Sequence, residues 1–219
     1  MNPAFEIVPD PQNPLRLTTK GLREIGQDEI ASEVSRFELL PGNESFLRFI
    51  GNYVLAQDKR IRAGQTMGYG YWTVRFAADP SGFLTAEEHD PRDLSFVPGV
   101  SYAVSVWERQ REECVHRRTD FNPPRPDQYV MISPDAVTAD TPVDAVRYPS
   151  PQHMSGWWLS SPDYSGPVSS MLRQHLYHLT DSRPELVQYL ALPPGYRFQW
   201  DAGKASARFD PAVATEDAV

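Results

Sequence analysis

The spacing of apolar residues along the chain predicts two amphipathic helices. In the first, Phe46, Ile50 and Val54 recur on one face after Asn43, a residue favoured at helix N-termini, so residues 44–58 are expected to be helical. The second is expected to begin at Ser101 and to cover residues 101–116. One of its faces carries Ala103, Val106, Trp107, Gln110 and Cys114. Charged residues occupy the opposite face, as on an ordinary solvent-exposed helix.

Short segments rich in β-branched and aromatic residues, bounded by glycine and proline, predict strands. They lie at residues 5–8, 15–19, 29–34, 71–77, 129–132, 155–161 and 196–200. Side chains alternate between the two faces of a strand, so the neighbours Trp157 and Trp158 must point in opposite directions. One ring can therefore line a core while the other meets solvent or a partner.

A third helix is expected over residues 183–190. The order of Ser182, Pro184 and Glu185 is that of a capping box, with a cap residue, a proline in the first turn and a glutamate three positions after the cap. The apolar residues that follow at helical spacing are Leu186, Val187, Leu190 and Ala191. The Pro-Pro-Gly sequence at 193–195 prevents the helix from continuing.

These elements together predict an α+β fold with a mixed or antiparallel sheet and two to four packed helices, in one domain or two subdomains. We divide the chain into an N-terminal α+β region (1–140), a C-terminal α+β region (141–200) and a tail (201–219). Residues 138–144 are expected to be the linker between the regions. The tail is rich in alanine and lacks periodicity, which predicts disorder.

Charge and composition narrow the classes of partner. The chain has 219 residues and a net charge of −8, which disfavours nucleic acid and favours electrostatic steering of a basic protein partner. Neither a signal peptide nor a membrane span is visible, so a cytoplasmic protein that does not bind membranes is expected. The single cysteine, Cys114, excludes an internal disulfide, and its place on an apolar helix face indicates a buried, inert thiol.

One window, residues 79–93, is strongly acidic. It holds five acidic residues and one arginine, a net charge of −4, half that of the whole chain. A solvated loop is one interpretation, and an electrostatic docking patch is the other.

The sequence contains no pattern typical of a catalytic or metal site. His175 and His178 lie three residues apart and could join His153 around a metal ion, but no paired cysteines or H-E-x-x-H pattern supports this. We therefore expect no metal and no cofactor. Asp163 and Glu185 could act as general acid and base, which leaves a hydrolase or transferase of an unrecognised family, using histidine and carboxylates, as an alternative function.

A set of short motifs in the last third of the chain resembles a family of bacterial immunity proteins from polymorphic-toxin loci. The motifs are Ser155-Gly156-Trp157-Trp158, Asp163-Tyr164, Arg183-Pro184-Glu185-Leu186, and Tyr189-Leu190-Ala191-Leu192-Pro193 followed by Gly195. The resemblance implies a protein without catalytic activity that binds a cognate secreted toxin and occludes it. A regulatory interaction module is a further alternative.

The expected partner-binding surface combines one of Trp157 and Trp158 with Asp163 and Tyr164, since aromatic rings beside acidic groups are typical of binding hot spots. The acidic window is a second candidate that would mainly raise the rate of association. Its candidate residues are Glu87, Glu88, Asp90 and Asp93.

Overall fold

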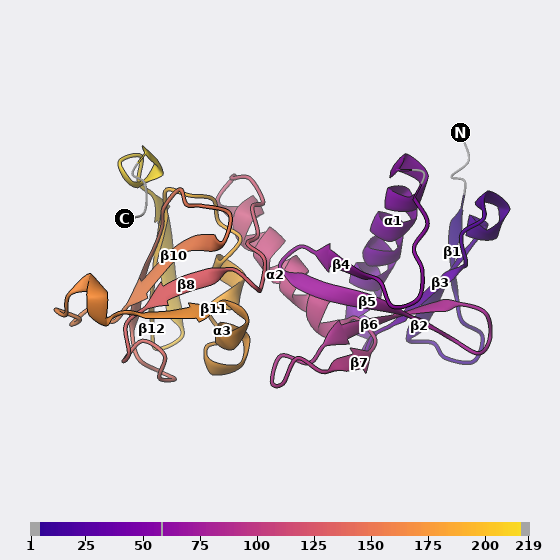
Figure 1. The fold of residues 1–219 in the computed structure, drawn as a ribbon, viewed down its shortest axis with the longest axis horizontal. Coiled ribbons are helices and arrows are strands. Elements are labelled where there is room, and N and C mark those ends of the chain that lie inside the picture. Colours follow the sequence, from indigo (N-terminus) through magenta and orange to yellow (C-terminus); the bar gives the residue numbers. More distant parts are fainter. Residues whose placement is uncertain (1–4, 58, 216–219) are drawn as a thin grey trace. The chain divides into compact units, whose positions relative to one another are not determined.

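The computed structural model describes residues 5–57 and 59–215 of the chain (Figure 1). The chain divides into two compact units, Met1–Glu108 and Arg109–Val219, and the division falls inside a helix, α2 (Ser101–His116). Each unit contains its own mixed sheet, and the described residues include three α-helices in all. The predicted α+β fold with packed helices is therefore confirmed.

The first unit is built on a seven-stranded sheet. Its strands are β1 (Glu6–Pro9), β2 (Arg16–Lys20), β3 (Ile30–Glu33), β4 (Thr66–Tyr69), β5 (Trp72–Ala78), β6 (Leu84–His89) and β7 (Phe96–Pro98). The order across the sheet is β1-β2-β3-β6-β5-β4, with β7 also paired to β6. The strands pair antiparallel except for β3 and β6, which run parallel.

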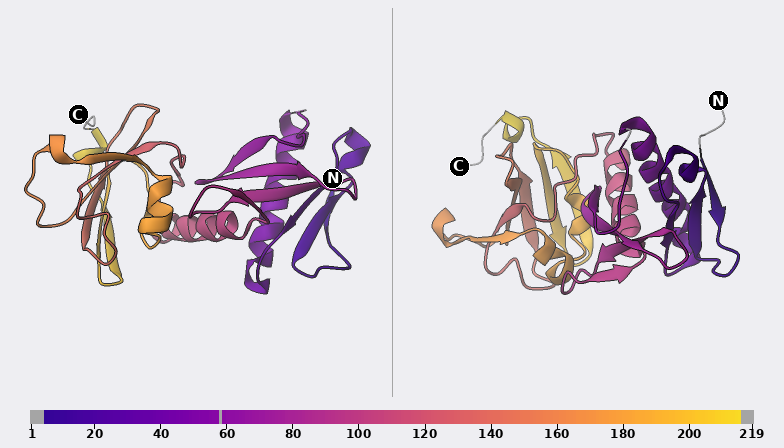
Figure 2. Two further views of the ribbon diagram at one scale, coloured as in Figure 1. Left: turned by 60° about the horizontal axis from the view of Figure 1, so that its bottom comes forward. Right: turned by 45° about the vertical axis from the view of Figure 1, so that its right-hand side comes forward.

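The long helix α1 (Leu40–Gln57) packs against β1, β2 and β3 (Figure 2). Its buried face includes Phe46, Ile50 and Val54, as the apolar spacing predicted. Asn43 does not cap this helix, because the structure places it inside, where its carboxamide bonds to Ser32 of β3. The 3-10 helices of this unit are η1 (Leu22–Ile25) and η2 (Phe37–Leu39).

The second unit is built on a six-stranded sheet. Its strands are β8 (Tyr129–Ile132), β9 (Val143–Arg147), β10 (Met154–Ser160), β11 (Leu172–His175), β12 (Tyr196–Asp201) and β13 (Lys204–Phe209). Their order is β11-β8-β10-β9-β12-β13, in which β8 and β10 run parallel and the other pairs are antiparallel. The remaining elements are α3 (Tyr177–Ser182), η3 (Val168–Ser170), η4 (Val187–Tyr189) and η5 (Val213–Thr215).

The core of the second unit lies on one face of this sheet. Buried side chains of the sheet include Val130, Ile132, Trp157, Leu159 and Phe198. Buried apolar residues from the segment between β11 and β12 include Leu176, Leu179, Leu186, Val187 and Leu190. The rings of Trp157 and Phe198 lie 5.2 Å apart, and those of Tyr189 and Phe198 lie 5.0 Å apart, so the segment and the sheet share this core.

The predicted helix over 183–190 is wrong, although its apolar residues are buried as expected. The helix in this region, α3, ends at Ser182, whose hydroxyl donates to the carbonyl of His178 instead of capping a new helix. Turns and the short η4 follow. The reason is Arg183, which is fully buried and donates to the carbonyls of Ala136 and Thr141. These distant contacts replace local helical hydrogen bonding.

The boundaries of the units also differ from the expected regions. The structure divides the chain at 108/109 instead of 140/141, because β8 pairs with β10 and β11 of the second sheet. Part of the expected linker belongs to β9. The tail predicted to be disordered contains β13, which pairs with β12 through a two-residue turn, while residues 216–219 lie outside the described residues. Among the described residues, no helix combines the length and apolarity that a membrane span needs.

Candidate partner-binding face

The outer face of the second sheet, opposite its core, carries a row of side chains from all six strands. Residues that pair directly across neighbouring strands point to the same face of a sheet. The pairings place Arg173, Met131, Trp158, Val146, Arg197 and Arg208 side by side in this order. The row has an apolar centre at Trp158, and we call this surface the Trp158 face.

A bulge at Gly156 decides which of the two tryptophans reaches this face. The register between β8 and β10 shifts between Met154 and Trp158. Gly156 lies in the shift with a φ of 81°, and a Cβ atom there would overlap the carbonyl oxygen of Tyr148. Only glycine adopts this conformation readily, so the Ser-Gly-Trp-Trp motif has a structural reason.

Trp157 points into the core and is completely buried. Its indole N–H donates to the carbonyl of Leu190 over 2.9 Å. The partner-binding prediction for Trp157 is corrected accordingly, because a side chain with no exposed surface cannot contact a partner. Trp158 is partly exposed on the opposite face, and its Nε1 has no hydrogen-bond partner among the described residues.

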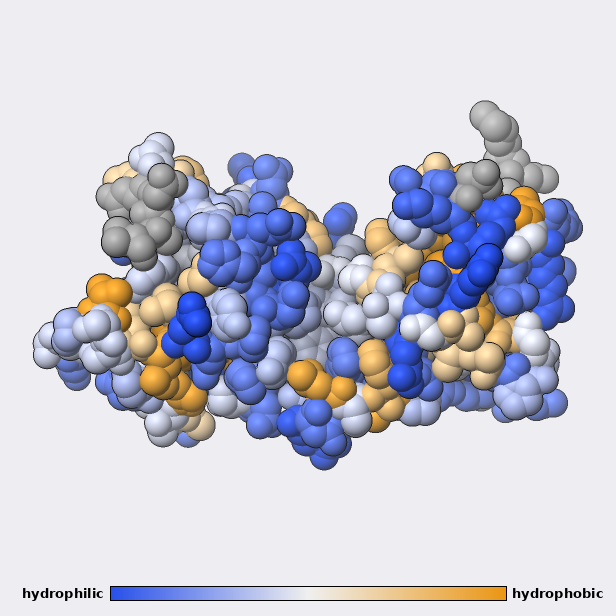
Figure 3. Space-filling model, in the orientation of Figure 1, coloured by the Kyte–Doolittle hydropathy of each residue, from blue (hydrophilic) through white to orange (hydrophobic). Residues whose placement is uncertain are grey.

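A groove of ≈ 430 Å³ lies on the Trp158 face. Three aromatic rings line it, those of Trp158, of Tyr148 after β9, and of Tyr164 in the connection between β10 and β11. Apolar side chains of Val146, Val168 and Met171 complete its lining together with polar groups. Figure 3 shows apolar residues in orange beside this projecting connection. The structure thus brings two of the predicted residues, Trp158 and Tyr164, into one concave site.

The position of Tyr164 is fixed by its own loop. Its hydroxyl donates to the carbonyl of Pro167 over 3.0 Å and lies 2.5 Å from the hydroxyl of Ser170. A side chain at position 166 would collide with this hydroxyl, so Gly166 permits the arrangement. Asp163 is exposed in the turn that precedes Tyr164. It does not line the groove.

Two charged residues of opposite sign also line the groove. Asp144 of β9 accepts a hydrogen bond from the side chain of Gln199 over 2.8 Å, and no cation among the described residues pairs with it. Arg197 of β12 donates through Nε to Asp210 over 2.9 Å. Arg197 also holds the pKa of Asp210 below its usual value. The charge of Arg197 is therefore neutralised within the chain by Asp210, whereas that of Asp144 is not.

Two buried arginines organise the core beneath this face. Arg147 donates to the main-chain carbonyls of Asn122, Leu192 and Ser155, and burial lowers its pKa to about 10. Arg183 also bonds to Glu185 over 2.5 Å. The Arg-Pro-Glu-Leu motif is therefore structural, since its arginine satisfies carbonyl groups that would otherwise be buried without partners.

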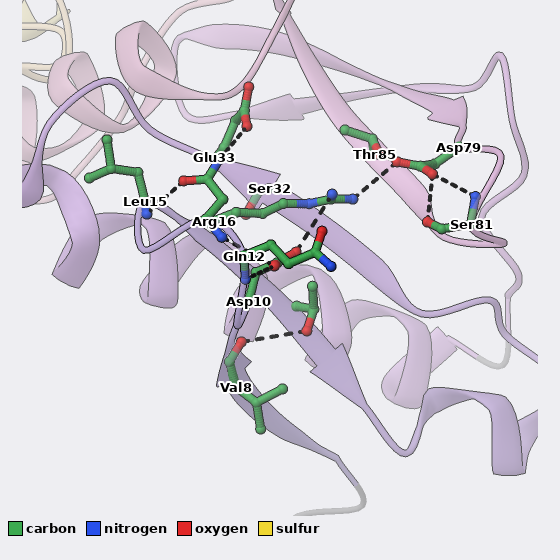
Figure 4. Close-up of polar contacts among 12 residues, drawn as sticks. Val8, Asp10, Gln12, Leu15, Arg16, Ser32, Glu33, Asp79, Ser81 and Thr85 are labelled. Atoms are coloured by element: carbon green, nitrogen blue, oxygen red, sulfur yellow. Dashed lines mark hydrogen bonds and ion pairs between the residues drawn. The ribbon is translucent and has the colours of Figure 1, made fainter.

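The acidic window is only partly a loop, because its residues 84–89 form β6. Glu87 on this strand pairs with Arg75 over 2.5 Å, and Asp90 pairs with Arg92 over 2.5 Å. Figure 4 shows Asp79 in a tight turn, bonded to Ser81, Thr85 and Arg16. Of the four candidate residues, Asp93 is exposed and bonds to the backbone of Ser95. Pairing inside the chain weakens the long-range field that a docking patch needs.

Glu88 is buried, so its predicted role in contacting a partner is also corrected. Its carboxylate accepts the backbone N–H groups of Tyr102 and Ala103 over 2.8 and 2.6 Å at the N-terminus of α2. Burial raises the pKa of Glu88 to about 7, against the opposing effect of these hydrogen bonds. Glu88 therefore caps a helix that the sequence correctly located.

The other candidate chemical groups are dispersed. His175 lies in β11 and donates through Nδ1 to the carbonyl of Asp127, whereas His178 lies in α3, so the two do not share a helical face. In the described part of the chain, no group of three or more His, Cys, Asp or Glu residues could hold a metal ion. Cys114 is buried, and this burial raises its pKa to about 11, so it is a protonated thiol at neutral pH.

Sequence reasoning missed three groove residues, Asp144, Tyr148 and Arg197. Asp144 was assigned to a linker, yet Val143–Arg147 alternates strictly between buried and half-buried positions. The outward positions 144, 146 and 148 follow from that period of two. This alternation is one of burial and not of residue type, because the apolar Val146 points outward and the charged Arg147 is buried, so the sequence pattern did not signal Asp144 or Tyr148.

Comparison with known protein families relates the second unit to one of them. The model of a family described as Imm33-like domain matches residues 109–210, just under half of the chain. This stretch almost coincides with the second unit, Arg109–Val219, and supports an immunity-protein-like family. No curated protein and no solved structure matches the chain.

Proposed function

We propose that the protein is an immunity protein that binds a cognate bacterial toxin and neutralises it by occlusion, with the Trp158 face as its docking surface. Binding, not catalysis, is the proposed activity, and the bacterial cytoplasm is its proposed location. The observation that carries the proposal is the match of residues 109–210 to the Imm33-like domain.

The surface itself supports a binding role. Aromatic residues are enriched at the centres of protein interfaces, because they bury large apolar areas with little loss of side-chain entropy, and polar groups surround them at the rim. Trp158 and Tyr164 provide such rings in one groove, and Asp163 lies in the turn beside Tyr164. A toxin that covered the groove would bury all three residues together.

The net charge of −8 supports a basic toxin as the partner. Opposite net charges accelerate association at low ionic strength. At an ionic strength of 0.1 M, salt screens this attraction beyond a Debye length of roughly 10 Å. The acidic window would contribute to the association rate mainly through the exposed carboxylate of Asp93, whereas the Trp158 face would determine the rate of dissociation.

The proposal is tested with the toxin domain encoded by a neighbouring gene, purified and titrated by calorimetry. Wild type is expected to bind, and Trp158→Ala and Tyr164→Ala each to weaken binding by about 2 kcal/mol, a typical hot-spot loss. Asp163→Ala should weaken binding through loss of a charge. The melting temperatures of Tyr164→Ala and Asp163→Ala should remain unchanged.

The matched control is Val115→Ala, which truncates an apolar side chain that is 64 % exposed on α2, outside the groove. It should leave toxin affinity unchanged. Unaltered affinity in all three face variants would locate the interface elsewhere. Absence of toxin binding by the wild-type chain would refute the immunity function.

A further inference from the structure

We infer that the groove on the Trp158 face receives a cationic side chain, an arginine or a lysine, from the partner. The inference rests on the proposed function and specifies the chemistry of the same site. Three aromatic rings and one carboxylate without a cation line the same hollow, and this combination fits an organic cation better than an apolar or acidic group.

The rings provide the first part of the argument. The rings of Tyr148 and Trp158 lie 6.5 Å apart at an interplanar angle of 89°, so they form two adjoining walls at right angles. Tyr164 lines the same groove, and its hydroxyl is already bonded to its own loop. A cation placed against such rings is attracted by the negative face of each π system.

Asp144 provides the second part. Its carboxylate is half-buried on the groove, and the hydrogen bond from Gln199 leaves further acceptor capacity on its two oxygens. No cation of the described residues neutralises it. A guanidinium or ammonium group in the groove would contact the rings and this carboxylate at once.

Arg197 lines the same groove, and its own bonding decides against an acidic occupant. Its guanidinium donates to Asp210, so an acid entering the groove would compete with an existing ion pair and would approach Asp144, a like charge. A cation would approach Asp144, an opposite charge, and Arg197, whose positive charge Asp210 already balances. The groove volume of ≈ 430 Å³ lies within the range of about 300–1,000 Å³ typical of pockets for small ligands.

The inference can be tested on the full chain with single amino-acid probes. N-acetylarginine methylamide is titrated against the protein, with N-acetylnorleucine methylamide as the uncharged probe and N-acetylglutamate methylamide as the acidic probe. Binding is followed by the NMR signal of the Trp158 indole N–H, identified by its loss in Trp158→Phe. The arginine probe should shift this signal and bind about tenfold more tightly than norleucine, corresponding to 1.4 kcal/mol.

The variant Asp144→Asn removes the charge of the groove carboxylate and should weaken the arginine probe at least fivefold without affecting norleucine. The matched control is Asp201→Asn, a neutralised acid that is exposed on β12 and does not line the groove, and it should change neither. Equal binding of arginine and norleucine, or tighter binding of the glutamate probe, would overturn the inference.

Toxin binding separates this inference from the proposed function. Toxin affinity that is lost in Trp158→Ala but unchanged in Asp144→Asn would overturn the cationic occupant and leave the immunity function standing. Arginine-probe binding in a protein that binds no toxin would support the groove chemistry and refute the proposed function.

Discussion

The two adjacent tryptophans of β10 should respond very differently to truncation. Trp157→Ala removes a fully buried indole that packs on Phe198 and donates to the carbonyl of Leu190. Truncation of a buried tryptophan to alanine typically costs about 3–5 kcal/mol. The lost hydrogen bond adds about 1 kcal/mol and not more, because Arg147 also donates to this carbonyl.

The expected loss for Trp157→Ala is therefore about 4–6 kcal/mol, a large part of the roughly 5–15 kcal/mol by which domains are stable. Trp158→Ala should cost only about 1–2 kcal/mol, because its ring is partly exposed and its indole N–H makes no hydrogen bond in the described chain. The two positions are adjacent in the sequence, so the difference in stability loss arises because Trp157 lies on the core face of the sheet and Trp158 on its outer face.

Urea unfolding followed by far-ultraviolet circular dichroism measures both variants without relying on tryptophan fluorescence. The midpoint should fall strongly for Trp157→Ala and slightly for Trp158→Ala, with similar slopes against urea concentration. Equal losses, or a larger loss for Trp158→Ala, would refute the assignment of the two rings to core and surface.

Further predictions concern the effect on stability of the glycine in the β10 bulge, of a buried leucine and a half-buried serine, and of pH. Gly156→Ala should destabilise the protein by at least about 2 kcal/mol in urea melts, because it combines a positive φ with a collision against the Tyr148 carbonyl. Leu190→Ala should lower the free energy of unfolding by about 2–5 kcal/mol, because Leu190 is fully buried. Ser182→Ala should lower it by less than about 1 kcal/mol, since its exposed hydroxyl only bonds to the preceding helical turn. Equal losses in urea melts would contradict these placements. Burial raises the pKa of Glu88 from 4.5 to about 7, so the folded state holds the proton more tightly, and stability should decrease by at most roughly 3 kcal/mol as pH rises from 4.5 through 7. Urea midpoints at pH 5 and pH 8 measure this loss, and a slope that Glu88→Gln leaves unchanged would show that another group titrates.

The local sequence determined those helices and strands in which the spacing of apolar residues matches the face that is buried in the fold. The α2 helix begins and ends where its apolar spacing places it, and β8 occupies the predicted residues. The α+β class follows from such segments, because a helical stripe or an alternating strand must bury its apolar side wherever it packs. Alternation also required Trp157 and Trp158 to face opposite ways.

The tertiary structure decided what depends on contacts between distant residues. The Ser-Arg-Pro-Glu sequence has the local pattern of a helix start, but burial of Arg183 against the carbonyls of Ala136 and Thr141 outweighs it. Pairing with β12 turns a small-residue tail into β13. The groove likewise joins Asp144, Trp158 and Tyr164, because strand pairing and a loop fixed by its own hydroxyl contacts bring them together. A period along the chain specifies the face on which a residue lies, whereas pairing across the sheet specifies its neighbours.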